Sequence, residues 1–220
     1  MLKKIADNQD ETSLAVQFRR KRFAFFNSLL SRLSRPVSIL DVGGAEGYWQ
    51  TMGMDADDRV FITLLNLTHE QVAIPNITSV VGDARELGYD DDSFDIVFSN
   101  SVIEHVGGHA HQLKMAKEAM RVGKRHFIQT PNRYFPLEPH FLFPFFQFLP
   151  VVVRLRLLQR FNLGWFPRTP EPAKAREIIE SIRLLGKNEF LTLFPGSQLY
   201  EEKVLGMTKS FIAYGGWGSQ

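Results

Sequence analysis

The chain has 220 residues, of which 26 are Lys or Arg and 24 are Asp or Glu, so its formal net charge is +2. This near-balance does not indicate a nucleic-acid-binding protein, and nucleic acid is not among the expected partners. The sequence contains no cysteine, which excludes disulfides, thiolate metal sites and a cysteine nucleophile. The length predicts a single domain, residues 1–220, with a full hydrophobic core.

The first 33 residues support two predictions: the protein is cytoplasmic, and its fold begins with an amphipathic helix. Residues 1–8 contain no apolar segment of the kind that directs secretion. The basic cluster at residues 19–22 is expected on the solvated side of a helix that spans residues 12–33. The apolar stripe of this helix is predicted to consist of Leu14, Phe18, Phe25, Leu29 and Leu33.

The next segment is typical of a nucleotide-binding turn. A buried strand is predicted at residues 37–42 and a helix at residues 48–54, with a glycine-rich turn between them. Glycine permits positive φ and lets a ligand approach the backbone, and the helix N-terminus presents unpaired N–H groups. In doubly wound sheets, nucleotides bind at such a turn after the first strand.

The spacing of the glycines excludes two common nucleotide motifs. Counted from Gly43, a dinucleotide motif needs glycine at its third and sixth positions, which here are Ala45 and Tyr48. No Lys-Ser/Thr pair follows, as a P-loop requires. The segment instead resembles motif I of the class I S-adenosylmethionine (SAM)-dependent methyltransferases, acidic-x-Gly-x-Gly-x-Gly, with Ala45 in place of the middle glycine. The resemblance implies that the cofactor contacts include Asp41, Gly43, Gly44, Ala45 and Gly47.

A second signature lies further along the chain. Strands are predicted at residues 60–65, 77–81 and 94–99, with a short helix near residues 69–72. The turn after the third strand and the block of residues 91–106 resemble the type 11 group of these methyltransferases. This resemblance implies that Asp83 accepts a hydrogen bond from the adenine amino group, that the Ala84 N–H faces a ring nitrogen, and that Ser99 also contacts the cofactor.

One position departs from the family pattern. After the second strand, the group usually has an acidic residue that binds both ribose hydroxyls, but this chain has Asn66. An amide can accept from one hydroxyl and donate to the other. Charged hydrogen bonds contribute about 1.5–3 kcal/mol and neutral ones about 1, so we expect SAM binding to be weaker by roughly tenfold.

The residues after the fourth strand indicate the kind of acceptor. The Asn/Asp-Pro-Pro-Tyr/Phe motif of enzymes that methylate adenine or glutamine nitrogen is absent, and Ser99-Asn100-Ser101-Val102 stands there. An oxygen or carbon acceptor on a small molecule fits better. His105 is a candidate general base, although it could equally pack at the start of the next helix. Glu104 is interpreted as a ligand contact or as a solvated helix start.

A helix is predicted at residues 110–121, a strand at 126–130 and the last helix at 173–185. The long stretch at residues 131–172 is predicted to be an irregular insertion on the acceptor side of the sheet. Its Pro-Asn…Glu-Pro-His pattern resembles bacterial members of the type 11 group. We interpret His140 as a base and Glu138 as the group that orients it. The alternative is that both only satisfy buried backbone groups. The predicted catalytic residues are thus His140, His105 and Glu138.

Residues 141–166 are rich in Phe, Leu and Val, with arginines interleaved. One interpretation is a peripheral contact with membrane lipid or a greasy acceptor pocket. The other, which we favour, is a lid that packs on the sheet with its arginines solvated at the rim. No metal site is expected, because Gly107-Gly108 interrupts helical pairing among His105, His109 and His111.

Two final strands, at residues 189–194 and 207–214, are expected to form an antiparallel hairpin. Together with the alternating strands and helices, they predict a doubly wound α/β fold with a seven-stranded, mostly parallel sheet. The predicted function is SAM-dependent methyl transfer to an oxygen or carbon of a lipid, quinone, polyketide or glycan precursor. Two alternatives are a non-catalytic SAM-fold binding module at a membrane, suggested by Ala45 and Asn66, and a nicotinamide oxidoreductase, which the missing glycines disfavour.

Overall fold

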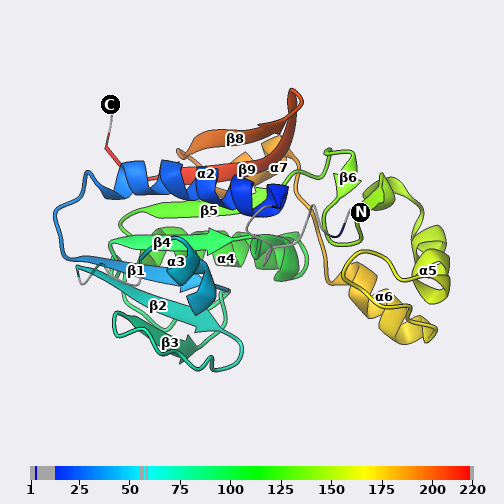
Figure 1. Cartoon of the computed structure of the whole chain (residues 1–220), viewed down its shortest axis with the longest axis horizontal. Helices are drawn as coiled ribbons and strands as arrows, with labels where there is room; N and C mark the ends of the chain where they lie inside the picture. The colour runs from blue at the N-terminus through cyan, green and yellow to red at the C-terminus, as the bar shows by residue number, and fades with distance from the viewer. Residues whose placement is uncertain (1–2, 4–12, 55–56, 58, 219–220) are drawn as a thin grey trace.

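The computed structural model describes residues 3, 13–54, 57 and 59–218. Its centre is a seven-stranded sheet of order β3-β2-β1-β4-β5-β9-β8 (Figure 1). The first five strands in sequence are parallel to one another, whereas β9 is antiparallel to both β5 and β8. The strands are β1 (Val37–Val42), β2 (Val60–Asn66), β3 (Ile77–Val81), β4 (Ile96–Asn100), β5 (His126–Pro131), β8 (Gln198–Val204) and β9 (Met207–Gly215). The predicted fold class is therefore confirmed.

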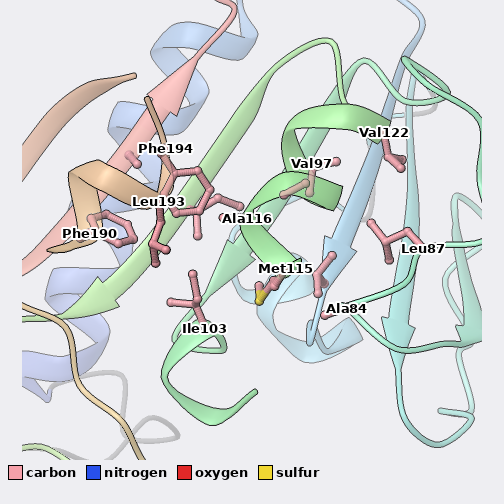
Figure 2. Packing of buried hydrophobic residues seen from close by; sticks show 14 of the residues in the cluster. Ala84, Leu87, Val97, Ile103, Met115, Ala116, Val122, Phe190, Leu193 and Phe194 are labelled. Carbon is pink, nitrogen blue, oxygen red and sulfur yellow. The ribbon is translucent and has the colours of Figure 1, made fainter. Parts of the chain in front are cut away.

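Helices cover both faces of this sheet, because successive side chains of a strand point to opposite faces. On β4, Ile96 and Phe98 belong to the core that packs against α2 (Leu14–Leu30). Val97 belongs to a second core, which packs against α4 (His109–Val122) and α7 (Lys187–Leu193). Figure 2 shows Met115 of α4 and Phe190 and Leu193 of α7 in the second core. The helices are α2 (Leu14–Leu30), α3 (Glu46–Thr51), η1 (Ile103–His105), α4 (His109–Val122), η2 (Phe146–Phe148), α5 (Val151–Arg160), α6 (Pro172–Glu180) and α7 (Lys187–Leu193).

The opening helix differs from its prediction in extent and in buried face. It begins at Leu14 after a Ser13 cap, whose hydroxyl accepts the N–H of Val16, while Thr12 lies outside the described residues. Leu14, which we expected in the apolar stripe, is 49% exposed, and the buried face consists of Val16, Arg22, Phe23, Phe26, Leu29 and Leu30. The expected stripe is therefore confirmed at Leu29, with Phe25 and Leu33 packed against the same core, and is wrong at Leu14.

Arg22 was expected to be solvated but is buried. Its Nε donates to Glu202 Oε1 at 3.0 Å and its Nη2 to Glu202 Oε2 at 2.6 Å, so the α2 guanidinium and the β8 carboxylate neutralise each other. A third bond joins Arg22 to Asn100 at the end of β4. This charge-assisted pair, which joins residues far apart in sequence, is what makes burial of the arginine tolerable.

The predicted strand at residues 189–194 is a helix, α7. Phe190, Leu193 and Phe194 recur at the spacing of one helical face, and all three are buried. The hairpin partner of β9 is instead β8, so the expected antiparallel hairpin exists with a different first strand.

Three further predictions were wrong. Residues 69–72 are not helical; nearby, the carboxylate of Glu46 accepts the N–H groups of Ala73 and Ile74 at 2.6 and 2.7 Å, which satisfies an irregular path. Residues 131–172 are not irregular throughout, since they contain α5, η2 and a small antiparallel pair, β6 (Leu137–Glu138) with β7 (Phe143–Pro144). The last helix before α7 ends at Glu180 rather than at Leu185.

The insertion at residues 131–172 packs mainly with α6 rather than over the sheet. Figure 1 shows α5 and α6 beyond the ends of the parallel strands. A small separate core holds this part together, made of Phe141, Phe146, Leu158, Leu163, Ala175 and Ile179. The insertion thus forms a side wall at the carboxyl edge of the sheet.

Candidate functional site

A cavity of about 450 Å³ opens at the carboxyl ends of four parallel strands. Its lining comes from the segments that follow β1 (Val42 and Gly43), β2 (Leu65 to Thr68), β3 (Gly82 to Arg85) and β4 (Val102, His105 and Val106). This is the crevice in which open α/β sheets bind their ligands, and its volume is within the roughly 300–1,000 Å³ usual for small-molecule sites.

The turn after β1 has no space for larger residues. Gly43 has φ +74°, and a Cβ on it would lie 2.4 Å from Val102 Cγ2. A Cβ on Gly44 would lie 1.8 Å from Asp41 Oδ2. Only glycine therefore fits at both positions, for a backbone reason at Gly43 and for a packing reason at Gly44.

Asp41 lies beneath this turn and is 2% exposed. Its Oδ2 accepts the indole N–H of Trp49 at 2.7 Å, and its Oδ1 has no partner within the described part of the chain. Burial raises the pKa of the Asp41 carboxyl to about 7, although the Trp49 bond acts in the opposite direction. A buried acceptor without a partner beside the crevice suits a ligand with a hydrogen-bond donor.

Asn66 makes a structural hydrogen bond that requires an amide group at this position. Its Nδ2 donates to the Gly44 carbonyl oxygen at 2.8 Å, which ties the end of β2 to the glycine turn. A carboxylate cannot donate this bond. Asn66 also lines the cavity, so its Oδ1 could accept from a ligand while the amide nitrogen holds the turn.

Asp83 lines the same cavity but already has a cationic partner. Arg85 donates from Nε to Asp83 Oδ1 at 2.9 Å and from Nη2 to Oδ2 at 2.5 Å. This hydrogen bonding by Arg85 holds the pKa of Asp83 down at about 2. Asp83 therefore stays ionised, and a ligand donor would share its carboxylate with Arg85. The next residue, Ala84, also lines the cavity.

The other predicted cofactor residues do not line this cavity. Ala45 and Gly47 are exposed, whereas Ser99 is buried and its hydroxyl donates to the Val42 carbonyl at 3.0 Å. Asp41 and Gly44 lie behind Gly43 in the turn. Leu67, Glu70 and Arg85 also line the cavity and were not predicted. Their closeness in sequence to the predicted residues is the signal that could have indicated them. The roles of all these residues in cofactor binding stay predictions.

Glu138 and His140 form a bonded pair in the turn between β6 and β7. Glu138 is 2% exposed; its Oε2 accepts the backbone N–H groups of His140 and Phe141, at 2.8 and 2.6 Å, and its Oε1 contacts His140 Nδ1 at 2.7 Å. Burial acts to lower the pKa of His140, but the bond to Glu138 and the nearby carboxylates outweigh it and raise that pKa. Nδ1 is thus held, and Nε2 remains for a ligand.

Glu104, His105 and His140 converge although they come from two separate segments. One carboxylate oxygen of Glu104 and one ring nitrogen of each histidine lie within 4.8 Å of one another. Glu104 is fully buried; Thr130 donates to its Oε2 at 3.0 Å, and its Oε1 has no partner among the described residues. Burial raises the pKa of Glu104 to about 7, despite the lowering effect of His140.

His105 connects this cluster to the main cavity. Its ring stands edge-on to that of His140, with the centroids 4.8 Å apart, and it lines the cavity. The side chain is exposed, yet desolvation by the atoms packed around the ring, and secondarily His140, lower its pKa to about 4. His105 is therefore neutral near pH 7 and a weaker base than His140.

His105 has different neighbours from the two histidines with which we weighed, and rejected, a metal site. His105 lies with Glu104 and His140, and this is the group in the described residues that could hold a metal ion, whereas we had considered His105 with His109 and His111. Nothing in the local spacing indicated the grouping, because Glu104 and His140 are far apart in sequence. The absence of a metal site stays a prediction.

Comparison with known proteins agrees with the crevice geometry. Residues 38–126 match a family described as a methyltransferase domain. An uncharacterised methyltransferase of Mycolicibacterium vanbaalenii is 32% identical over 95 residues, which are 39% of this chain and 34% of the relative. The chain thus covers about a third of the length of the curated relative that it matches.

Two solved structures share the fold. A SAM-dependent methyltransferase from Aquifex aeolicus has a TM-score of 0.53 at 13% identity and covers 97% of this chain and 95% of its own. A protein from Pyrococcus horikoshii has a TM-score of 0.56 at 16% identity and covers 93% and 92%. These matches show that the chain has the fold of these structures and that residues 38–126 resemble a methyltransferase domain. Membership of the class I SAM-dependent methyltransferases and SAM as the cofactor stay predictions.

The packing of the turn predicts opposite results for two glycine substitutions. Gly44→Ala should lower the free energy of unfolding by about 1–3 kcal/mol, because the new methyl group overlaps the Asp41 carboxylate. Gly47→Ala is the control: nothing lies within 4 Å of its Cβ, and alanine in a helix is favoured over glycine by about 1 kcal/mol. Urea unfolding of the ligand-free proteins measures both. Equal stabilities for the two variants would contradict the packing.

Asn66→Asp restores the acidic residue that the family usually has, yet it should be harmful here. The Gly44 carbonyl loses its donor, so we expect a loss of about 1–3 kcal/mol of stability and no gain in SAM affinity. Asn188→Asp, the same change at an exposed residue of α7, should alter stability by no more than about 0.5 kcal/mol. Tighter SAM binding by Asn66→Asp, measured by calorimetry, would refute this role of the amide.

Proposed function

We propose that this chain, part of which is a methyltransferase domain, transfers the methyl group of SAM to an oxygen or carbon of a small, moderately apolar molecule. The observation that carries the proposal is the Glu138–His140 pair, because the ring of His140 stands edge-on to that of His105, a residue that lines the crevice. A lipid, quinone, polyketide or glycan precursor would suit such a site.

The residues around the crevice fit SAM. Gly43 leaves the backbone open to the ligand, and Asn66 and Asp83 line the wall where the family binds ribose and adenine. SAM supplies an electrophilic methyl group on a sulfonium. The protein must hold the acceptor in line with that methyl group and take up a proton where the acceptor carries one.

His140 is the residue that we assign to proton removal. Where the acceptor is a hydroxyl group, its oxygen would gain the methyl group that SAM supplies, and its proton would pass to His140 Nε2. Glu138 is a positioning residue: it fixes the ring through Nδ1 and stabilises the imidazolium that forms. Glu104, within 4.8 Å of the same ring, adds a second carboxyl group that favours this charge.

A second cavity suits the acceptor. It measures about 190 Å³ and lies between the insertion and the segment after α6, with Glu138 in its wall. Its lining combines apolar side chains (Phe141, Phe146, Ile179, Ile182 and Leu184) with Arg133, Arg154 and Arg183. An acceptor with an apolar body and a polar or anionic substituent would match this lining.

Calorimetric titration with SAM, S-adenosylhomocysteine and NAD tests the cofactor. We expect micromolar dissociation constants for the two adenosyl ligands, near −8 kcal/mol, and no heat with NAD. If the folded protein binds none of the three ligands, a non-catalytic module would be favoured. Preferential binding of NAD would favour an oxidoreductase.

His140→Ala should reduce kcat/KM by about 10²–10⁴-fold, as expected for loss of a general base, while the dissociation constant of SAM is unchanged. His109→Ala, an exposed histidine at the start of α4, is the matched control and should keep full activity. An acceptor screen with radiolabelled SAM supplies the assay, and a chelator should not alter the rate. Full activity of His140→Ala would transfer the role to His105.

The pH profile separates the base from its orienter. Since the pKa of His140 is raised above its ordinary value and the neutral ring is the active form, kcat/KM should rise with pH through a limb above about pH 6.5. Glu138→Gln removes the charge that raises this pKa, so the limb should move to lower pH while the maximal rate falls. An unmoved limb would show that another group titrates.

A further inference from the structure

The insertion carries a group of large apolar side chains that the fold leaves in water. Within residues 145–165, the exposed fractions run from 36% at Val151 to 56% at Val152 and Phe161. We call this group the apolar patch; it consists of Phe145, Phe148, Val151, Val152, Val153, Phe161 and Trp165. Single exposed apolar residues are normal on a protein surface and need no explanation. Seven of them in one short segment indicate an interaction surface.

The charge of the same segment is one-sided. Residues 139–170 contain Arg154, Arg156, Arg160 and Arg168 and no Asp or Glu. All 24 acidic residues of the chain lie elsewhere, together with 22 of its 26 basic ones, so the rest of the chain has a small negative excess. Arg156, Arg160 and Arg168 are exposed. The near-neutral total therefore conceals a local basic and apolar surface.

The patch is not needed to hold the insertion together. The core shared by the insertion and α6 buries Phe146, Leu158 and Leu163, which lie between the patch residues in sequence. Phe145 has φ +57°, a left-handed conformation that costs a bulky residue roughly 1–3 kcal/mol, and its ring is still 55% exposed. Backbone strain is thus kept at a residue whose side chain does not fill the core.

We propose that the apolar patch docks on the surface of an anionic lipid membrane. Apolar side chains would enter the boundary between headgroups and acyl chains, and the surrounding arginines would pair with lipid phosphates. No helix in the described residues is long and apolar enough to span a membrane, so the contact is interfacial. A second copy of the chain is a poorer occupant, since each surface would carry the exposed Arg156, Arg160 and Arg168, and like charges that face each other repel.

Docking would place the smaller cavity close to the lipid. Phe146, Gln147 and Arg154 line that cavity and belong to the same segment as the patch. An acceptor held in the membrane would then reach the cavity without crossing bulk water. The docking itself does not rest on methyl transfer, because it can be measured without SAM or acceptor.

Vesicle flotation of the full chain tests the proposal, with neutral phosphatidylcholine vesicles compared with vesicles that contain phosphatidylglycerol. The wild-type protein should bind the anionic vesicles, and less well at high salt. Val152→Asp should weaken binding by at least tenfold. Leu205→Asp, the control, changes a leucine that is 93% exposed in the β8–β9 turn and should bind like wild type.

The charge contribution is tested by Arg156→Glu against Arg32→Glu, both at exposed arginines. Loss of an arginine near an anionic surface should reduce binding by at least fivefold, equivalent to about 1 kcal/mol, whereas Arg32→Glu should not. Thermal unfolding confirms that each variant is folded. Absence of wild-type binding, equal binding to neutral vesicles, or dimerisation abolished by Val152→Asp would each overturn the proposal.

Discussion

The tight space beneath the turn after β1 is the constraint on which the site depends. The chain must leave a buried strand and enter α3 while the Asp41 carboxylate occupies the volume next to Gly44 and Val102 presses on Gly43. Side chains at these two positions would displace the carboxylate or the segment after β4. Because the turn stays slim, its backbone forms one wall of a cavity that the ends of β2, β3 and β4 complete.

Paired carboxylates hold the surroundings of that cavity in place. Glu202 neutralises Arg22 and so fixes α2 against the β8–β9 hairpin, while Glu138 holds both the backbone and the ring of His140. Glu104 differs, because one of its oxygens is buried without a partner in the described structure. Such a group costs free energy in folding, and it lies where a reacting acceptor would need a polar neighbour.

The insertion has an inner side that faces a cavity and an outer side that faces solvent. Its inner residues, with α6, form a small core and a cavity wall at the carboxyl edge of the sheet. Its outer residues form the basic and apolar patch that we assign to a lipid surface. The lid that we expected on the sheet is therefore a wall beside it, and the membrane contact stays a proposal.

The parallel strands, the glycine turn and the position of the crevice could be predicted from local patterns in the sequence: apolar runs, glycine spacing and strand–helix alternation. Residues 189–194 were misassigned, since a short apolar run is compatible with either a strand or a helix until its packing partner is known. Three contacts became visible only in the folded chain: Asn66 holds Gly44, Arg22 is buried against Glu202, and Glu104 lies near His140. These contacts join residues 22 to 180 positions apart, and pairing over such separations depends on how the elements pack, which no local pattern encodes.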